Sequence, residues 1–448
     1  MNNHKPVFHI TGEKGWINDP NGVVKFKGQY HVFYQHHPYS NVWGPMHWGH
    51  VVSDDLIHWT YLPFALTPGD EFDRDGCFSG SSLVVGDTLY IAYTGFINNE
   101  ENGKPEDNRQ IQCLASSKDG IHFVKHGAII TEKELPKEYL PCDFRDPKLT
   151  YKNGEYLLFA AAKKRSGGGS IVLFKSKDLM KWEFVSDVLT HNSEGEMIEC
   201  VDYHEDLGLL IYSEQNFPVD NDFCLNIHSC DYEIGELNNE GKFINKYPKQ
   251  LLDYGFDFYA PQVMNDCHYL VAWMDMWERN NPSEKYGFAG MLTIPRKVTI
   301  KGDKLLQEPV ILKNKVKELD INNIYKDNIS VGAIKLEIED LKDLSINLRM
   351  GENEVTKIYL QEKEIYFDRS HSGEPIYGKE QDELSLRGMR KMPYLKQEKD
   401  TIYLVLDKYS VELFVNGISM SNVIYPQESS DGLEIKLQSK SSKITIYK

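Results

Sequence analysis

The sequence predicts an all-β protein in which a five-bladed β-propeller is followed by a C-terminal β-sandwich. Two patterns carry this prediction. A turn-and-strand motif recurs at nearly even steps through the N-terminal part, and apolar and polar residues alternate strictly in the tail. No segment between the motifs shows sustained helical spacing. The chain of 448 residues is also too long for one hydrophobic core, which favours two domains.

Five hairpin motifs predict the propeller. In each, a Gly, Asn or Asp turn leads into an aromatic or aliphatic strand, and the equivalent positions are Tyr30, Tyr90, Tyr156, Leu209 and Tyr269. A second segment recurs three times, as SDDLIHW, SKDGIHF and SKDLMKW from Ser53, Ser117 and Ser176. Antiparallel units of about 60 residues are typical of radial repetition in a propeller. A single β-sandwich is the alternative, and it would not explain the even steps.

The pattern changes from Pro309 onward. A polar stretch precedes runs such as AIKLEIE and TIYLVLD, in which alternate residues are apolar. Such alternation marks half-buried strands, and the acids and lysines between them are expected on the solvent side. The predicted organisation is therefore a propeller over residues 1–308, a linker over 309–328 and a β-sandwich domain over 329–448.

Composition excludes several classes of partner. Fifty basic and 67 acidic residues give a formal charge of −17, which repels phosphate backbones and anionic lipid. We therefore expect no nucleic acid and no membrane as partners. No apolar run has the length of a membrane span, and no leader pattern is visible at the start of the chain. Seven cysteines without a C-x-x-C spacing favour a reducing, cytoplasmic location. A homo-oligomer stays open.

Three acids occupy one phase of the repeat. Asp19 precedes its hairpin marker by 11 residues, and Asp146 and Glu199 each precede theirs by 10. Taken singly, each has an ordinary explanation: a turn acid, an ion pair with a neighbouring cation, and a solvated loop charge. Because equivalent positions in a propeller lie equally far from its axis, the three carboxylates together are expected to converge on the central channel.

Converging carboxylates repel one another, and their pKa values separate. One charged and one protonated carboxyl form the apparatus for cleaving a glycosidic bond. The surrounding residue types suit a sugar, because they combine aromatic faces with hydrogen-bonding groups. The aromatic candidates are Trp16, Trp43, Trp48, Phe78, Tyr259, Trp273 and Trp277, and the polar ones are Asn18, Asn21, Gln35, Ser79 and Arg145.

The motifs resemble those of glycoside hydrolase family 32. The similar segments include WINDPNG (residues 16–22), FRDPK (144–148), the pair Glu199 and Cys200, and FSGS (78–81). The likeness is close from Val7 to Arg296, and LDKYSVELFVNG in the tail resembles the family's sandwich domain. Small departures are Ile17, where methionine is common, and Ile198 and Val201, where tryptophan and proline are frequent.

The resemblance implies a β-fructofuranosidase that acts on sucrose, sucrose 6-phosphate or short fructo-oligosaccharides with retention. Asp19 would be the nucleophile, Glu199 the general acid and base, and Asp146, steadied by Arg145, the transition-state stabiliser. The fructose pocket would be lined by Asn18, Gln35, Trp43, Phe78, Ser79 and Trp273. We expect neighbouring amides and the Trp16 indole to lower the pKa of Asp19, and the other acids to raise that of Glu199. Retention predicts about 5–5.5 Å between the carboxyls of Asp19 and Glu199.

Other interpretations remain open at this point. A fructosyltransferase would use the same acids, and a non-catalytic sugar-binding propeller would be expected to lack one of them. His47 and His50 invite a metal site, but the spacing is weak, and we expect neither metal nor cofactor. Cys200 has no paired base in the sequence and is expected to shape the pocket. The basic run 163–165 is either a phosphate contact or a solvated loop.

Overall fold

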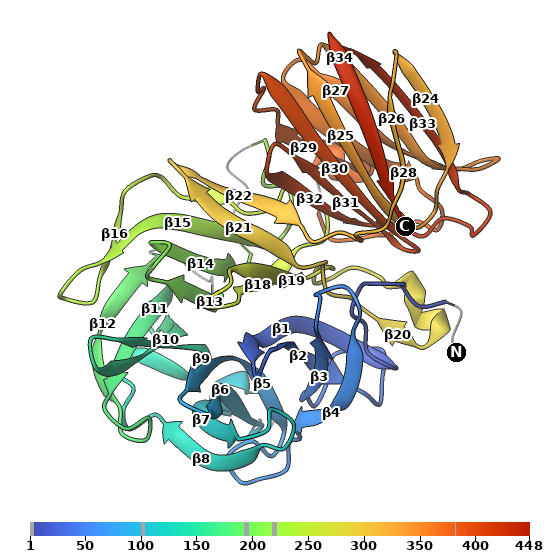
Figure 1. Ribbon diagram of the computed structural model, residues 1–448. Helices are drawn as coiled ribbons and strands as arrows, with labels where there is room; N and C mark the ends of the chain where they lie inside the picture. Colours follow the sequence, from blue (N-terminus) through green and yellow to red (C-terminus); the bar gives the residue numbers. More distant parts are fainter. Residues whose placement is uncertain (1–3, 100–103, 192–196, 217–221, 381) are drawn as a thin grey trace.

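The computed structural model describes residues 4–99, 104–191, 197–216, 222–380 and 382–448. Its regular secondary structure consists almost entirely of strands, which form seven sheets with mostly antiparallel pairing (Figure 1). Among the described residues the only α-helix is α1 (Glu383–Leu386), and two 3-10 turns cover Pro105–Asp107 and Pro282–Tyr286. The predicted fold class, a five-bladed propeller followed by a β-sandwich, is confirmed.

Five sheets form the propeller, and we call them blades 1 to 5 in chain order. Blade 1 contains β1 (Gly15–Phe26), β2 (Gln29–His37), β3 (His47–Ser53), β4 (Thr60–Leu66) and β20 (Phe288–Ala289). Blade 2 contains β5 (Gly76–Val85), β6 (Thr88–Ile97), β7 (Arg109–Ser117) and β8 (Val124–Ile130). Blade 3 contains β9 (Tyr139–Lys152), β10 (Glu155–Lys164), β11 (Gly169–Ser176) and β12 (Glu183–Thr190).

The last two blades complete the circle. Blade 4 contains β13 (Ile198–His204), β14 (Leu209–Glu214), β15 (Ser229–Leu237), β16 (Phe243–Asn245) and β17 (Gln250–Leu251). Blade 5 contains β18 (Tyr259–Val263), β19 (Tyr269–Trp273), β21 (Arg296–Lys301) and β22 (Lys304–Pro309). The first strands of neighbouring blades contact one another all the way round, β18 against β1 included. They therefore surround the axis, and β20 closes the ring by pairing in parallel with β1.

The hairpin markers lie where the repeat predicts. Each one stands at or near the start of the second strand of its blade: Tyr30 in β2, Tyr90 in β6, Tyr156 in β10, Leu209 in β14 and Tyr269 in β19. The recurring Ser-x-Asp segments form three equivalent turns. In the first, the Ser53 hydroxyl accepts the amide of Leu56 at 2.8 Å, and Asp55 Oδ1 accepts that of His58 at 2.8 Å. The same bonds recur from Ser117 and Ser176.

The two sheets of the C-terminal sandwich have six strands each. One is ordered β23 (Lys315–Asp320), β34 (Ser441–Tyr447), β25 (Gly332–Glu339), β30 (Lys399–Asp407), β31 (Ser410–Val415), β32 (Ile418–Val423). The other is ordered β24 (Ile324–Asn328), β33 (Gly432–Gln438), β26 (Asp343–Met350), β27 (Val355–Gln361), β28 (Glu364–His371), β29 (Met389–Pro393). Their facing apolar residues form one continuous buried cluster.

The segment 309–328, expected to be a linker, contains two of these strands. β23 and β24 are edge strands of the two sandwich sheets and pair with β34 and β33. Most of their side chains are exposed, because an edge strand has one neighbour and little core behind it. This exposure explains why their sequence lacks the apolar alternation of the other strands.

Candidate active site

A β-bulge interrupts the first strand of every blade at the same height. Pairing with the second strand shifts register between Ile17 and Pro20, Phe78 and Gly80, Arg145 and Lys148, Glu199 and Asp202, and Tyr259 and Gln262. A bulge adds a residue to one strand and turns its side chain. Asp19 and Asp146 lie within two of these bulges, and Glu199 borders a third. The bulges therefore explain how three blades aim carboxylates at one axis.

The backbone is strained at three of these bulges, at Ala260 in blade 5 and at one residue each in blades 3 and 4. Asp146 has φ of 61° and Cys200, which follows Glu199, has φ of 50°. Non-glycine residues adopt such left-handed conformations at a cost of about 1–3 kcal/mol, and they gather at functional sites. Bonds between blades hold both residues. The amide of Asp146 donates to Thr94 Oγ1 at 2.9 Å, and the amide of Cys200 donates to Asp146 Oδ2 at 2.9 Å.

The acids line a cavity of about 740 Å³. This volume lies in the range of roughly 300–1,000 Å³ that is usual for small-molecule sites. Ten of the fifteen candidate residues are on its wall: Asn18, Asp19, Gln35, Trp43, Phe78, Ser79, Arg145, Asp146, Glu199 and Trp277. The other five, Trp16, Asn21, Trp48, Tyr259 and Trp273, are not. Trp43 and Phe78 form an aromatic pair there, with ring centroids 5.5 Å apart. The structure thus gathers residues from five separate strands and two loops.

Tyr259 and Trp273, also expected at the sugar, do not line the cavity. Tyr259 is 1% exposed, and its hydroxyl is turned to Glu199 Oε2, to which it donates at 2.7 Å. Trp273 is fully buried, because its ring packs against Trp16 at 5.6 Å and Trp277 at 5.0 Å. Tyr259 therefore holds Glu199 in position, and Trp273 packs behind Trp16 and Trp277. Of the two tryptophans Trp273 and Trp277, Trp277 is the one that lines the cavity.

Asp19 accepts three hydrogen bonds. Ser79 Oγ donates to its Oδ2 at 2.6 Å, Asn18 Nδ2 to its Oδ1 at 3.1 Å, and Cys200 Sγ to its Oδ2 at 3.4 Å. The Trp16 indole, expected to donate to this carboxylate, donates instead to Asn18 Oδ1 at 2.8 Å. It orients the amide and so acts on Asp19 through Asn18.

The pKa of Asp19 is raised, not lowered as the sequence led us to expect. Burial is the main cause, and the charge of Glu199 adds to it. The hydrogen bonds from Ser79, Asn18 and Cys200 act in the opposite direction, because they favour the carboxylate. The prediction took the hydrogen-bond donors into account but not the desolvation of the Asp19 side chain, which is buried at the bottom of the cavity.

Asp146 is the second buried acid. Burial raises its pKa to about 7; Arg145 opposes this shift, while the charges of Glu199 and Asp19 increase it. Since the carboxyls influence one another, their protons leave as those of a coupled set.

Arg145 bridges the acids of blades 3 and 4. Its Nη2 lies 2.9 Å from Glu199 Oε1, and its Nη1 lies 3.1 Å from Asp143 Oδ1. Burial acts to lower the pKa of Arg145, but the charges of Glu199, Asp143 and Asp146 raise it, so the group stays cationic. Glu199 therefore has a fixed cation on one oxygen and the hydroxyl of Tyr259 on the other.

Several wall residues carried no signal in the sequence. Gln110, His228, Glu278 and Lys379 line the same cavity. They stand in loops or at strand ends, outside the phase of the repeat, and Lys379 belongs to the C-terminal part of the chain. Only the assembled structure brings them to the site.

Other candidates from the sequence lie elsewhere. His47 Nδ1 lies 3.2 Å from the carbonyl oxygen of Pro45, and His50 Nε2 lies 3.0 Å from His31 Nδ1. Among the described residues, no three His, Cys, Asp or Glu side chains are grouped so as to hold a metal ion. Burial raises the pKa of Cys200 well above its usual value, so its sulfur remains a thiol.

The basic run 163–165 does not reach the cavity. Lys164 pairs with Asp187 at 2.8 Å, and Arg165 Nε donates to the carbonyl oxygen of Lys137 at 2.9 Å. In the described part of the chain, no helix combines the length and the apolar character of a membrane span.

The arrangement is suited to cleavage of a glycosidic bond. It combines Asp19, which accepts three hydrogen bonds, Glu199, which is held by Arg145 and Tyr259, and Asp146, whose pKa is affected by the charges of both. These are the groups that a displacement at an anomeric carbon needs: a nucleophile, a proton donor and a stabiliser of positive charge.

Comparison with family models supports this chemistry. Residues 9–309 match the model of the glycosyl hydrolases family 32 N-terminal domain, and residues 304–448 match that of the family 32 C-terminal domain. Two curated relatives are similar over nearly the whole chain. A sucrose-6-phosphate hydrolase of Zymomonas mobilis is 35% identical, covering 95% of this chain and 88% of its own. A raffinose invertase of Escherichia coli is 35% identical, covering 96% and 91%.

Solved structures show the same architecture. A sucrose-6-phosphate hydrolase from Lactobacillus gasseri superposes with a TM-score of 0.88 at 25% identity, over 99% of this chain and 93% of that one. The GH32 beta-fructofuranosidase of Bombyx mori superposes with a TM-score of 0.82 at 29% identity, over 99% and 94%. A mutant of the Bombyx mori enzyme was solved in complex with sucrose.

Proposed function

The chain belongs to glycosyl hydrolases family 32, and we propose that it is a β-fructofuranosidase. It releases terminal, non-reducing β-D-fructofuranosyl residues from sucrose, sucrose 6-phosphate or short fructo-oligosaccharides. The observation that carries this proposal is the meeting of Asp19, Asp146 and Glu199, from three separate blades, in one cavity of sugar size. The curated relatives named for sucrose 6-phosphate and raffinose support the substrate class.

The reaction proceeds in two displacements. In the first, the Asp19 carboxylate attacks the anomeric carbon, the bond from this carbon to the leaving oxygen breaks, and Glu199 gives its proton to that oxygen. In the second, Glu199 takes a proton from water, whose oxygen attacks the same carbon and frees Asp19. Fructose leaves with its original configuration, and both acids return to their starting states.

The neighbouring groups serve the charge that develops. Asp146 stabilises positive charge on the fructosyl ring in its ionised form. Arg145, 2.9 Å from Glu199, holds the acid in place from one side while Tyr259 holds it from the other. Ser79, Asn18 and Cys200 donate to three of the four lone-pair directions of the Asp19 carboxylate, which leaves one on Oδ1 for attack.

Replacing the acid tests this assignment. We expect Glu199→Gln to lower kcat for sucrose by about 10²–10⁴-fold, because the leaving oxygen loses its proton donor. A substrate whose leaving group needs no proton should recover much of the first step. Release of glucose and fructose by the purified protein is the readout, and unchanged hydrolysis in this variant would contradict the role.

Two further expectations depend on the same proposal. None of the seven cysteines forms a disulfide, which supports a reducing, cytoplasmic setting. The cavity has the size of a small-molecule sugar site, and such a sugar is the proposed partner. A homo-oligomer stays an open prediction, since no surface is assigned to it.

A further inference from the structure

Among the described residues that line the catalytic cavity, two carry a positive charge, Arg145 and Lys379. Six acids share the wall with them: Asp19, Glu106, Asp143, Asp146, Glu199 and Glu278. A substrate with a negative charge is repelled by such a wall unless its charge meets a cation. Arg145 is already engaged by Glu199 and Asp143 beside the reacting centre. Lys379 is therefore the cation that a charged substrate group can reach.

Lys379 stands at the mouth of the cavity. Its side chain is 67% exposed and that of its partner Glu278 is 48% exposed, whereas Asp19 on the floor is 8% exposed. The proposed reaction puts the fructosyl ring on the floor, so the leaving sugar extends toward this mouth. A phosphate on that leaving sugar, as in sucrose 6-phosphate, would then lie toward the rim that carries Lys379.

Lys379 reaches the propeller from the sandwich, in the connection between β28 and α1. Two consecutive ion pairs join the two parts of the chain. Lys379 Nζ lies 2.6 Å from Glu278 Oε2 at the rim, and directly behind it the buried Arg279 pairs with Glu380. Because neighbours in one segment pair with neighbours in the other, the buried pair fixes the position of the exposed one.

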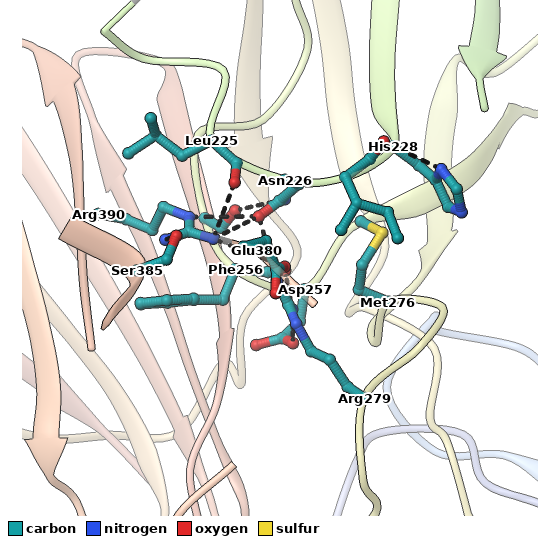
Figure 2. A network of polar contacts seen from close by, with 12 residues as sticks. Leu225, Asn226, His228, Phe256, Asp257, Met276, Arg279, Glu380, Ser385 and Arg390 are labelled. Carbon is teal, nitrogen blue, oxygen red and sulfur yellow. Dashed lines mark hydrogen bonds and ion pairs between the residues drawn. The ribbon is translucent and has the colours of Figure 1, made fainter. Parts of the chain in front are cut away.

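The network around the buried pair is dense (Figure 2). Arg279 Nη1 donates to Asp257 Oδ1 at 2.6 Å. Asn226 Oδ1 accepts from Arg279 Nη2 at 3.2 Å and from Arg390 Nη2 at 2.9 Å. Asn226 is two residues from His228, which lines the cavity. The sandwich thus anchors the rim of the active site from behind as well as at Lys379.

Glu278 pairs with Lys379 at the rim of the cavity, and its backbone is strained. Its φ of 67° is in the left-handed region, which a non-glycine residue adopts at a cost of about 1–3 kcal/mol. Its Oε2 lies 2.6 Å from the ammonium of Lys379. A phosphate carries more charge and three acceptor oxygens, so it competes well for the same ammonium.

We propose that Lys379 is a specificity-determining residue that binds the phosphate of a substrate phosphorylated on its leaving sugar, in competition with Glu278. This inference rests on the proposed function and names the class of substrate that the sandwich helps to select. The ammonium donates to phosphate oxygens and touches none of the reacting atoms, so its contribution appears in KM and not in kcat.

The test compares kcat/KM for sucrose 6-phosphate with kcat/KM for sucrose. We expect Lys379→Met to lower this ratio about 10-fold or more through KM, because a charge-assisted hydrogen bond is lost. Lys379→Arg should restore part of it. Glu278→Gln should raise the ratio, since one anion that competes with the phosphate for the ammonium is then removed. Lys118→Met is the matched control, because Lys118 forms an exposed ion pair with Asp87 away from the cavity and should leave both substrates unaffected.

The outcomes separate the two proposals. An unchanged ratio in Lys379→Met, equal losses for both substrates, a fall of the ratio in Glu278→Gln, or a wild-type protein that cleaves sucrose but not its 6-phosphate would each overturn the role of Lys379. These results would leave the β-fructofuranosidase intact. If the wild-type protein cleaves neither substrate, the proposed function fails and the inference fails with it.

Discussion

Asp19 is subject to opposing influences on its pKa. Burial raises it, whereas the hydrogen bond from Ser79 Oγ, 2.6 Å away, lowers it by stabilising the carboxylate. The nucleophile must be ionised to attack, so activity is lost as pH falls through this pKa. The serine thus extends the working range toward acid.

Ser79→Ala should therefore move the acidic limb of the pH profile of kcat/KM to higher pH. We also expect kcat/KM on the acid side to fall about 10-fold, because a hydrogen bond to a charged group contributes roughly 1.5–3 kcal/mol. Ser82→Ala is the matched control, since this buried serine donates to the carbonyl oxygen of Gly22 and not to an acid. An acidic limb that stays in place in Ser79→Ala would contradict the role given to this bond.

At the residue level, repeat phase was enough to select the acids, because a propeller converts equal sequence phase into equal distance from its axis. The position of a residue within the repeat says nothing about its desolvation, and so the predicted direction of the Asp19 pKa shift was wrong. The repeat also could not place Trp273, because Trp273 at the end of β19 and Trp277 in the turn that follows compete for one place on the wall, and only packing decides between them.

The three Ser-x-Asp turns are equivalent elements that fix the outer strands of blades 1, 2 and 3. Ser53 accepts a hydrogen bond from the buried amide of Leu56, and this bond offsets the strain of the positive φ of Leu56, 66°. Ser53→Ala should lower the free energy of unfolding by about 1–3 kcal/mol, because it leaves a buried donor without its partner. Chemical denaturation measures this effect.

Ser116→Ala provides the control for that measurement, since the Ser116 hydroxyl bonds to His126 at an exposed position. We expect its stability to stay close to that of the unmodified chain. Equal stability of Ser53→Ala and Ser116→Ala would show that the turn does not depend on the serine.

Some elements can be predicted from the sequence and others cannot. The hairpins can, because their turn residues and aromatic strands recur together. The bulges that hold Asp19 and Asp146 cannot, since a register shift needs no special residue type. Edge strands β23 and β24 were expected as linker because exposed strands lack alternation. The place of Lys379 at the cavity could not be predicted from the sequence, because a loop of one domain meets the other domain only in the folded chain.

The propeller and the sandwich are joined by a buried polar clasp. His9 bonds Asp407 through Nδ1 at 2.9 Å and Glu412 through Nε2 at 2.8 Å. Glu412 also pairs with Arg296 at 2.5 Å, and Arg296 pairs with Asp253 at 3.0 Å. Residues from the start of the chain, blade 5 and β31 thus meet in one network.

This clasp predicts a pH dependence of stability. Burial acts to lower the pKa of His9, but its bonds to Asp407 and Glu412 raise it from 6.5 to about 9. A pKa that is higher in the folded state stabilises the fold fully below pH 6.5, and this contribution is lost as pH rises through about 9. The melting temperature should accordingly decrease between these two values.

In His9→Gln that decrease should be smaller, and the melting temperature should already be lower at neutral pH. Gln keeps a donor for one acid but removes the charge that both acids share. Thermal melts across this pH window compare the two proteins. The same slope in both would contradict the assignment of the pH dependence to His9.

The central claim is that carboxyls from blades 1, 3 and 4 act together, with Asp19 as the group that bonds to the sugar. The most direct measurement is to react Glu199→Gln with a β-fructofuranoside that has a good leaving group, quench with acid, and analyse the peptides by mass spectrometry. Loss of the general base slows hydrolysis of the intermediate, so we expect one fructosyl ester on the peptide that contains Asp19. A fructosyl group found on Asp146, or a product of inverted configuration with no adduct at Asp19, would contradict the account.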